Sequence, residues 1–129
     1  MENNLIQSAI FNISDGGSVS SGAPSAGWNI LSGMTYRNSG NLLVINGTPR
    51  PAAGVMGGSL TNSVNVTIGV ALAFGSYTRF WAADMAEILV FNASLTVFQR
   101  EQVEGYLAWK WGLQTSLPAS HPFRNAPPQ

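Results

Sequence analysis

The chain has 129 residues, a formal net charge of zero and only 9% charged residues. This length predicts a single domain over residues 1–129, and the neutral charge excludes the basic surface by which proteins bind nucleic acid. Cysteine is absent, which excludes disulfides and Cys-ligated zinc, and no apolar run is long enough for membrane insertion.

The first half of the chain predicts short strands separated by turns. Residues 1–27 contain one strand, Leu5–Ile13, followed by a flexible linker rich in Gly and Ser. Further strands are expected over Trp28–Tyr36 and Asn41–Ile45. The second of these leads into Asn46-Gly47, a dipeptide typical of two-residue hairpin turns.

The remaining strands of the region 28–95 follow the same pattern. A return strand begins in Thr48–Ala52, and Val64–Val70 alternates apolar and polar residues, as in a strand with one solvated face. Tyr77–Ala83 is either a further strand or a binding loop. Ala86–Phe91 is apolar in both of its alternating sets, which favours a strand covered on both faces.

One helix is predicted over residues 96–112, followed by a docking tail over 113–129. Thr96 and Gln99 have the spacing of a capping box. Gly112 can adopt the left-handed conformation that ends many helices.

Helical periodicity assigns the faces of this helix. Val103, Leu107 and Trp111 form the stripe expected to face the core. A second patch is expected beneath the tail, and three charged residues are expected in solvent. The patch consists of Phe98, Tyr106 and Trp109, which Leu117 and Phe123 of the tail would cover, and the solvated residues are Arg100, Glu101 and Glu104.

Two single residues of this region have specific interpretations. Gly105 costs about 1 kcal/mol relative to Ala within a helix, which predicts a close backbone approach at this position. His121 is the only histidine. Because it lacks partner ligands, a structural role in docking the tail is favoured over metal binding or catalysis.

Three segments carry a family resemblance over residues 28–123: Trp28–Arg50 (WNILSGMTYRNSGNLLVINGTPR), Val64–Val70, and Ala86–Phe123 (AEILVFNASLTVFQREQVEGYLAWKWGLQTSLPASHPF). Their order resembles the C-terminal part of concanavalin A-like, laminin-G-like domains. Members usually have several more strands before the equivalent of Trp28 than residues 1–27 can supply. The resemblance therefore implies an all-β antiparallel sandwich, a jelly roll with one C-terminal helix, shortened at its N-terminus. Its open sheet edge would be completed by a partner chain.

The sequence shows no set of catalytic residues. Glycosidases need two carboxylates that face each other across a cleft, whereas Asp84 and Glu87 would point to opposite faces of a strand. No nucleophile elbow, phosphate loop or metalloprotease motif is present. We therefore expect no enzyme activity, no cofactor and no metal.

Two functions from different classes remain open. The first is a non-catalytic structural subunit of an extracellular assembly, such as a virion capsid, tail, fibre or surface filament, whose partners are other protein subunits. The alternative is a carbohydrate-binding or adhesion module of a secreted or cell-surface protein, in which aromatic rings stack on sugars and polar groups bind hydroxyls. The residues expected to bind glycans are Tyr36, Arg37, Asn38, Tyr77, Arg79 and Trp81.

Overall fold

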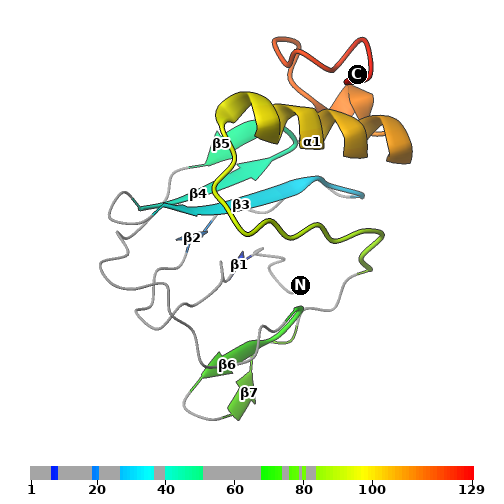
Figure 1. Ribbon diagram of the computed structural model, residues 1–129. Helices are drawn as coiled ribbons and strands as arrows, with labels where there is room; N and C mark the ends of the chain where they lie inside the picture. Colours follow the sequence, from blue (N-terminus) through cyan, green and yellow to red (C-terminus); the bar gives the residue numbers. More distant parts are fainter. Residues whose placement is uncertain are drawn as a thin grey trace.

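The computed structural model describes residues 7–8, 19–20, 27–36, 40–50, 68–73, 76–78, 80 and 84–129. These residues form seven short strands, one helix and one 3-10 turn (Figure 1). The elements are β1 (Gln7–Ser8), β2 (Val19–Ser20), β3 (Leu31–Tyr36), β4 (Gly40–Ile45), β5 (Thr48–Arg50), β6 (Ala71–Ala73), β7 (Ser76–Thr78), α1 (Val97–Trp111) and the 3-10 turn Gln114–Ser116.

The largest sheet is antiparallel and has the order β3-β4-β5. Its two strand pairs place Leu31 opposite Ile45 and Ile45 opposite Thr48. Asn46 and Gly47 form the β4–β5 turn with φ of 50° and 72°, as a two-residue hairpin turn requires. The hairpin predicted at Asn46-Gly47 is therefore confirmed.

The turn is also fixed from outside the hairpin. The Asn46 backbone N–H donates to the Ile30 carbonyl at 2.9 Å, and the Asn46 Oδ1 accepts from the Ile30 N–H at 2.8 Å. Successive residues Leu43, Val44 and Ile45 are all buried. Because neighbouring strand residues point to opposite faces, β4 is covered on both sides.

The two ends of α1 form as their local signals predict. The Thr96 hydroxyl accepts from the Gln99 N–H at 3.2 Å, and the Gln99 side chain accepts from the Thr96 N–H at 2.9 Å. This reciprocal pair is the predicted capping box. Gly112 has φ 70° and its N–H donates to the Ala108 carbonyl, so the predicted left-handed C-cap is also confirmed.

The predicted orientation of α1 is right for Leu107, which packs against the buried Ile30, Ala108 and Leu117, and wrong for Trp111 and for two of the charged residues. The helix buries Arg100, Glu104, Gly105 and Ala108, whereas Trp111 is 46% exposed. The periodicity selected the apolar stripe for the core. Arg100 and Glu104, which were expected in solvent, are buried as well, because the C-terminal tail brings His121 against Glu104.

The tail packs on α1, but it does not cover the predicted patch, because Phe98, Tyr106 and Trp109 all remain exposed. Leu117 is buried with Ile30 and Ala108 in one apolar cluster, which joins the tail, the residue before β3 and α1. The Phe123 and Phe98 rings lie 5.9 Å apart. A Cβ added at Gly105 would lie only 2.4 Å from the Phe123 Cβ. Gly105 therefore allows the close approach expected of it.

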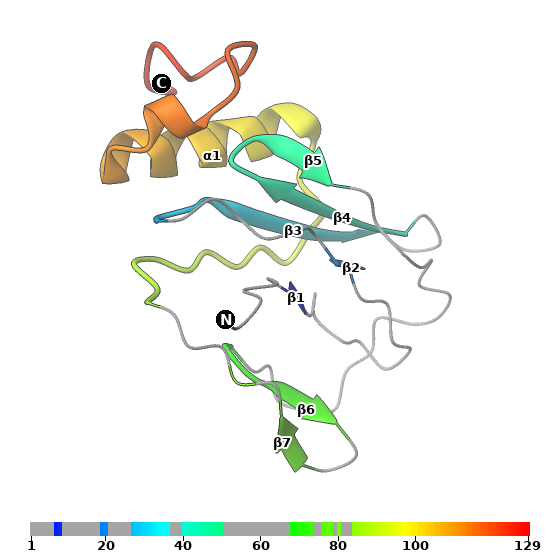
Figure 2. The ribbon, with the colours of Figure 1, turned by 180° about the vertical axis from the view of Figure 1, so that it is seen from behind.

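The predicted all-β sandwich is wrong for the part of the chain that the structure describes. One three-stranded sheet is present beside two separate two-stranded pairs, β1–β2 and β6–β7. A helix and the tail, rather than a second sheet, lie next to the β4–β5 hairpin (Figures 1 and 2). The turn confirms this placement, because a Cβ at Gly47 would meet His121 and Pro118 of the tail.

Several predicted strands also differ from the observed ones. Ala86–Phe91 has no strand ladder, so its prediction as a strand covered on both faces is wrong. Ile68, Gly69 and Val70 form a bend rather than the end of a strand. Most of Leu5–Ile13 and of Val64–Val70, and residues 79 and 81–83, lie outside the described residues.

Candidate functional site

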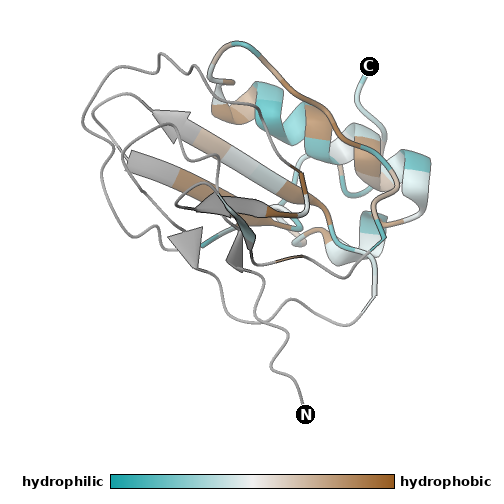
Figure 3. Cartoon of the chain, turned by 90° about the horizontal axis from the view of Figure 1, so that it is seen from below, coloured by the Kyte–Doolittle hydropathy of each residue, from teal (hydrophilic) through white to brown (hydrophobic). Residues whose placement is uncertain are grey.

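The most unusual surface of the described chain is the segment Ala86–Phe91, which we call the open segment. Four consecutive large apolar residues lie at its surface: Ile88 is 49% exposed, Leu89 42%, Val90 74% and Phe91 49%. Within the part of the chain that the structure describes, no strand pairing and no backbone hydrogen bond involves the open segment. Figure 3 shows it as a largely apolar segment near α1.

A polar cluster attaches the open segment to α1. The Trp111 indole N–H donates to Glu87 Oε2 at 2.9 Å, and the Tyr106 hydroxyl donates to Oε1 at 3.4 Å. Lys110 Nζ lies 3.1 Å from Oε1 and 3.0 Å from Oε2. We call these four residues the Glu87 anchor. Since Tyr106, Lys110 and Trp111 all lie in the second half of α1, the anchor holds the start of the open segment against that half.

The anchor changes the acidity of its charged members. The hydrogen bond from the Trp111 indole, together with Lys110, lowers the pKa of the Glu87 carboxyl below its ordinary value of 4.5. The hydrogen bond to the Tyr106 hydroxyl and the neighbouring Glu87 carboxylate raise the pKa of Lys110 above 10.5. Both shifts favour the charged pair.

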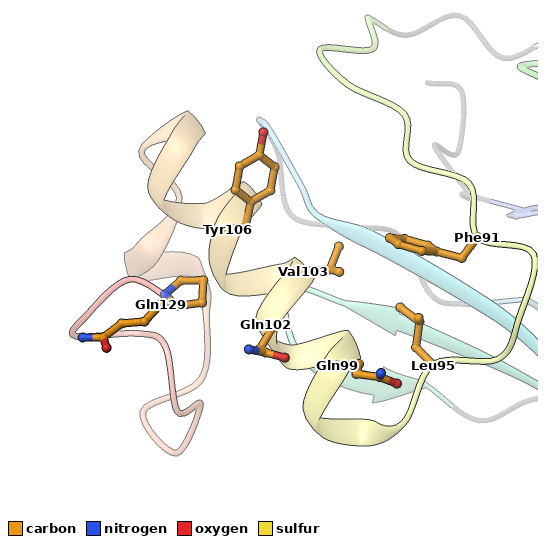
Figure 4. A pocket seen from close by; sticks show the side chains of 8 residues that line it. Phe91, Leu95, Gln99, Gln102, Val103, Tyr106 and Gln129 are labelled. Carbon is orange, nitrogen blue, oxygen red and sulfur yellow. The ribbon is translucent and has the colours of Figure 1, made fainter.

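A shallow groove of about 600 Å³ continues from the other end of the open segment along α1 (Figure 4). Phe91 and Leu95 form one side of the groove. Val103 lies on α1, between these two residues and Gln129 of the tail. The described residues that line it are Phe91, Leu95, Gln99, Gln102, Val103, Tyr106, Pro128 and Gln129. All eight of these side chains are apolar or uncharged, so none of them offers a charged group for acid–base chemistry.

A second cluster of ionisable residues is buried between α1 and the tail. Glu104 is completely buried, and its Oε2 lies 3.3 Å from His121 Nε2 while its Oε1 lies 3.3 Å from Arg100 Nε. The Phe123 backbone N–H donates to His121 Nδ1 at 3.2 Å. Because Nδ1 accepts this bond, neutral His121 carries its proton on Nε2 and donates it to Glu104.

A carboxylate beside a histidine is also the orienting pair of several catalytic sites. Catalysis needs a substrate within hydrogen-bond reach of the histidine, but both ring nitrogens of His121 are occupied by Glu104 and Phe123. The His121 side chain is only 3% exposed. The cluster therefore joins the tail to the helix and offers no access to a substrate. The predicted role of His121 in docking the tail is confirmed, whereas Arg100 and Glu104 were expected in solvent. The burial of Glu104 depends on His121, which is 17 residues away in the chain.

Of the residues predicted to bind glycans, the structure describes only Tyr36 and Tyr77, so the prediction stays untested. Tyr77 is exposed on β7, and Tyr36 is the last residue of β3, which belongs to a different sheet. Arg37, Asn38, Arg79 and Trp81 lie outside the described residues.

The described residues contain no group of three or more His, Cys, Asp or Glu side chains placed to hold a metal ion. No helix among them combines the length and the apolar character needed to cross a membrane.

Comparison of the whole chain with protein-family models, curated proteins and solved structures found no match. The laminin-G-like resemblance therefore stays a prediction from the sequence.

Proposed function

We propose that this protein is a non-catalytic structural subunit that works by associating with other protein chains in a virion or another extracellular assembly. The observation that carries the proposal is the open segment. Contiguous exposed apolar surface commonly marks a protein–protein contact, and an extended segment with unpaired backbone groups is a template for strand pairing.

The Glu87 anchor supports this function because it holds the segment in place before any partner binds. A segment that is already ordered loses less conformational entropy on association than a free one. The low charge of the chain supports it too, since 9% charged residues provide little electrostatic repulsion between subunits. An extracellular setting rests on a sequence whose polar residues are largely Ser, Thr and Asn and on the laminin-G-like resemblance.

The test is the state of association of the purified chain, measured by light scattering at micromolar concentrations. We expect an oligomer, and we expect Val90→Glu to shift it toward the monomer, because the new charge would be buried in the contact. Val97→Glu is the matched control. Val97 is 61% exposed at the start of α1, outside the open segment, and a Glu is favourable at a helix N-terminus.

Circular dichroism of both variants should show the helix signal of the parent chain. A monomeric parent that binds no hydrophobic dye would contradict the proposal. An oligomer that Val90→Glu leaves unchanged would contradict the role of the open segment.

A further inference from the structure

The structure describes two triplets of the form Asn-X-Ser/Thr, Asn46-Gly47-Thr48 and Asn92-Ala93-Ser94. Since the middle residue of each is not proline, both satisfy the acceptor pattern of N-linked glycosylation. Two more such triplets, which begin at Asn12 and Asn65, lie outside the described residues. An N-linked oligosaccharide is bulky and hydrated, and the folded chain can carry it only at its surface. The surroundings of Asn46 and Asn92 therefore distinguish the two described triplets.

The side chain of Asn46 takes part in the fold of the β4–β5 turn. Its Oδ1 accepts from the Ile30 backbone N–H at 2.8 Å, and its Nδ2 donates to the Asn29 Oδ1 at 2.9 Å. The turn also lies close to the tail, because a Cβ added at Gly47 would be 2.9 Å from the His121 ring. A sugar bonded to the Asn46 Nδ2 would crowd these neighbours, so the fold opposes a glycan at this residue.

Asn92 has the opposite surroundings. It lies in a bend between the open segment and α1, and the whole triplet Asn92-Ala93-Ser94 is exposed. The triplet belongs to none of the described strands or helices, and α1 begins after it, with Thr96 as its N-cap. A modification of the Asn92 amide therefore disrupts no strand pairing and no helix cap of the described fold.

We propose that Asn92 is a site of N-linked glycosylation and that Asn46 is not. The inference goes beyond the proposed function. It uses only the extracellular setting of that proposal, because an Asn-X-Ser/Thr triplet in a surface loop is an acceptor in secreted proteins. The group that the chain takes up is an oligosaccharide, and the donor is an oligosaccharide carried on a lipid diphosphate.

The reaction forms one bond and breaks one. With an oligosaccharyltransferase as catalyst, the Asn92 Nδ2 attacks the anomeric carbon of the donor and forms an N–C bond. The C–O bond to the diphosphate breaks, and its electron pair leaves with the lipid diphosphate. The Asn92 amide loses one proton to a base of the transferase, and nothing is oxidised or reduced. The Ser94 hydroxyl is the group that the acceptor pattern requires two residues after the asparagine.

A glycan on Asn92 also limits the contact made by the open segment. Asn92 directly follows Phe91, the last residue of that segment. An oligosaccharide carries many hydroxyl groups, and burying them without hydrogen-bond partners is costly. The apolar contact therefore ends before Asn92.

The test is secretion of the full chain from a eukaryotic host, directed by an added signal peptide. Ser14→Ala and Thr67→Val remove the two triplets outside the described residues and leave their asparagines in place. Peptide N-glycosidase in heavy-oxygen water converts each glycosylated asparagine to isotope-labelled aspartate, which mass spectrometry locates. We expect the label at Asn92 and none at Asn46.

Substitutions of single residues then identify the acceptor. Asn92→Gln and Ser94→Ala should each abolish the glycan, whereas Ser94→Thr should retain it, because a Thr hydroxyl also satisfies the pattern. Thr48→Val is the matched control. It removes the hydroxyl of the Asn46 triplet at an exposed position of β5, where a β-branched residue is favourable. This variant should keep the glycan of the parent, and all the variants should keep its helix signal in circular dichroism.

An unglycosylated parent overturns the inference, and so does a label at Asn46 or a glycan that persists in Asn92→Gln. The proposed function is decided separately, by light scattering of the unglycosylated chain. A chain that is glycosylated at Asn92 but monomeric when unglycosylated overturns the subunit proposal alone. An oligomer that the host secretes without a glycan overturns the glycosylation site alone.

Discussion

Replacing Gly105 by Ala has two opposing effects on the stability of the fold. In an exposed helix interior, replacing Gly by Ala stabilises by about 1 kcal/mol, because Ala loses less conformational entropy on folding. At this position the added Cβ would lie 2.4 Å from the Phe123 Cβ and 2.9 Å from its Cγ. The Phe123 Cβ is fixed to the tail backbone and does not move when the side chain rotates, so the tail itself must shift.

We therefore expect Gly105→Ala to lower the free energy of unfolding by about 1–3 kcal/mol, the usual cost of overpacking. Urea denaturation measures the change. Phe123→Gly provides the control, because it removes the atoms that the new methyl group would meet. In that background Gly105→Ala should become neutral or stabilising, and an unchanged penalty would show that Phe123 is not the cause.

At the scale of elements, the Glu87 anchor connects the open segment to α1. The pKa of Glu87 is lowered in the folded chain by the Trp111 hydrogen bond and by Lys110. A carboxyl with a lowered pKa contributes its full stability above its unfolded pKa, near 4.5. That contribution is lost as the pH falls through the lower, folded pKa.

We expect the open segment to separate from α1 in acid, below pH 4.5, while the helix signal in circular dichroism persists. The fluorescence of Trp111 reports the event, because its indole N–H bonds directly to Glu87. Trp111→Phe identifies the part of the signal that this residue contributes. Glu87→Gln should abolish the transition and Glu101→Gln should retain it. A transition unchanged in Glu87→Gln would contradict the anchor.

At the scale of the whole molecule, sequence patterns predicted features that neighbouring residues determine. The capping box at Thr96 and the turn at Asn46-Gly47 formed as expected, because each depends on residues only a few positions apart. The burial of Glu104 could not be foreseen in this way, because it depends on His121 in the tail. Nor could the exposure of Ala86–Phe91. An apolar pattern indicates a need for cover but does not identify the segment that provides it.

The last prediction concerns the long-range contact that joins the sheet, the helix and the tail. Leu117 is 1% exposed and packs with Ile30, next to β3, and with Ala108 of α1. Removing a buried Leu side chain costs about 2–5 kcal/mol, through lost burial and the cavity left behind. If the tail belongs to the same cooperative unit as the sheet and α1, Leu117→Ala should lower the free energy of unfolding of this whole unit by that amount.

The measurement is urea unfolding followed both by circular dichroism, which reports α1, and by tryptophan fluorescence, which reports the tail through Trp109, because the Trp109 indole N–H donates to the Phe123 carbonyl at 2.9 Å. Both signals should shift together. Val97→Ala, at an exposed site on α1, should change stability by about 0.5 kcal/mol or less. If Leu117→Ala shifts only the fluorescence and leaves the helix transition in place, the tail unfolds independently. In that case the tail would leave Ala108 and Ile30 uncovered while α1 stayed folded. Contacts other than the cluster of Ile30, Ala108 and Leu117 would then hold the sheet and α1 together.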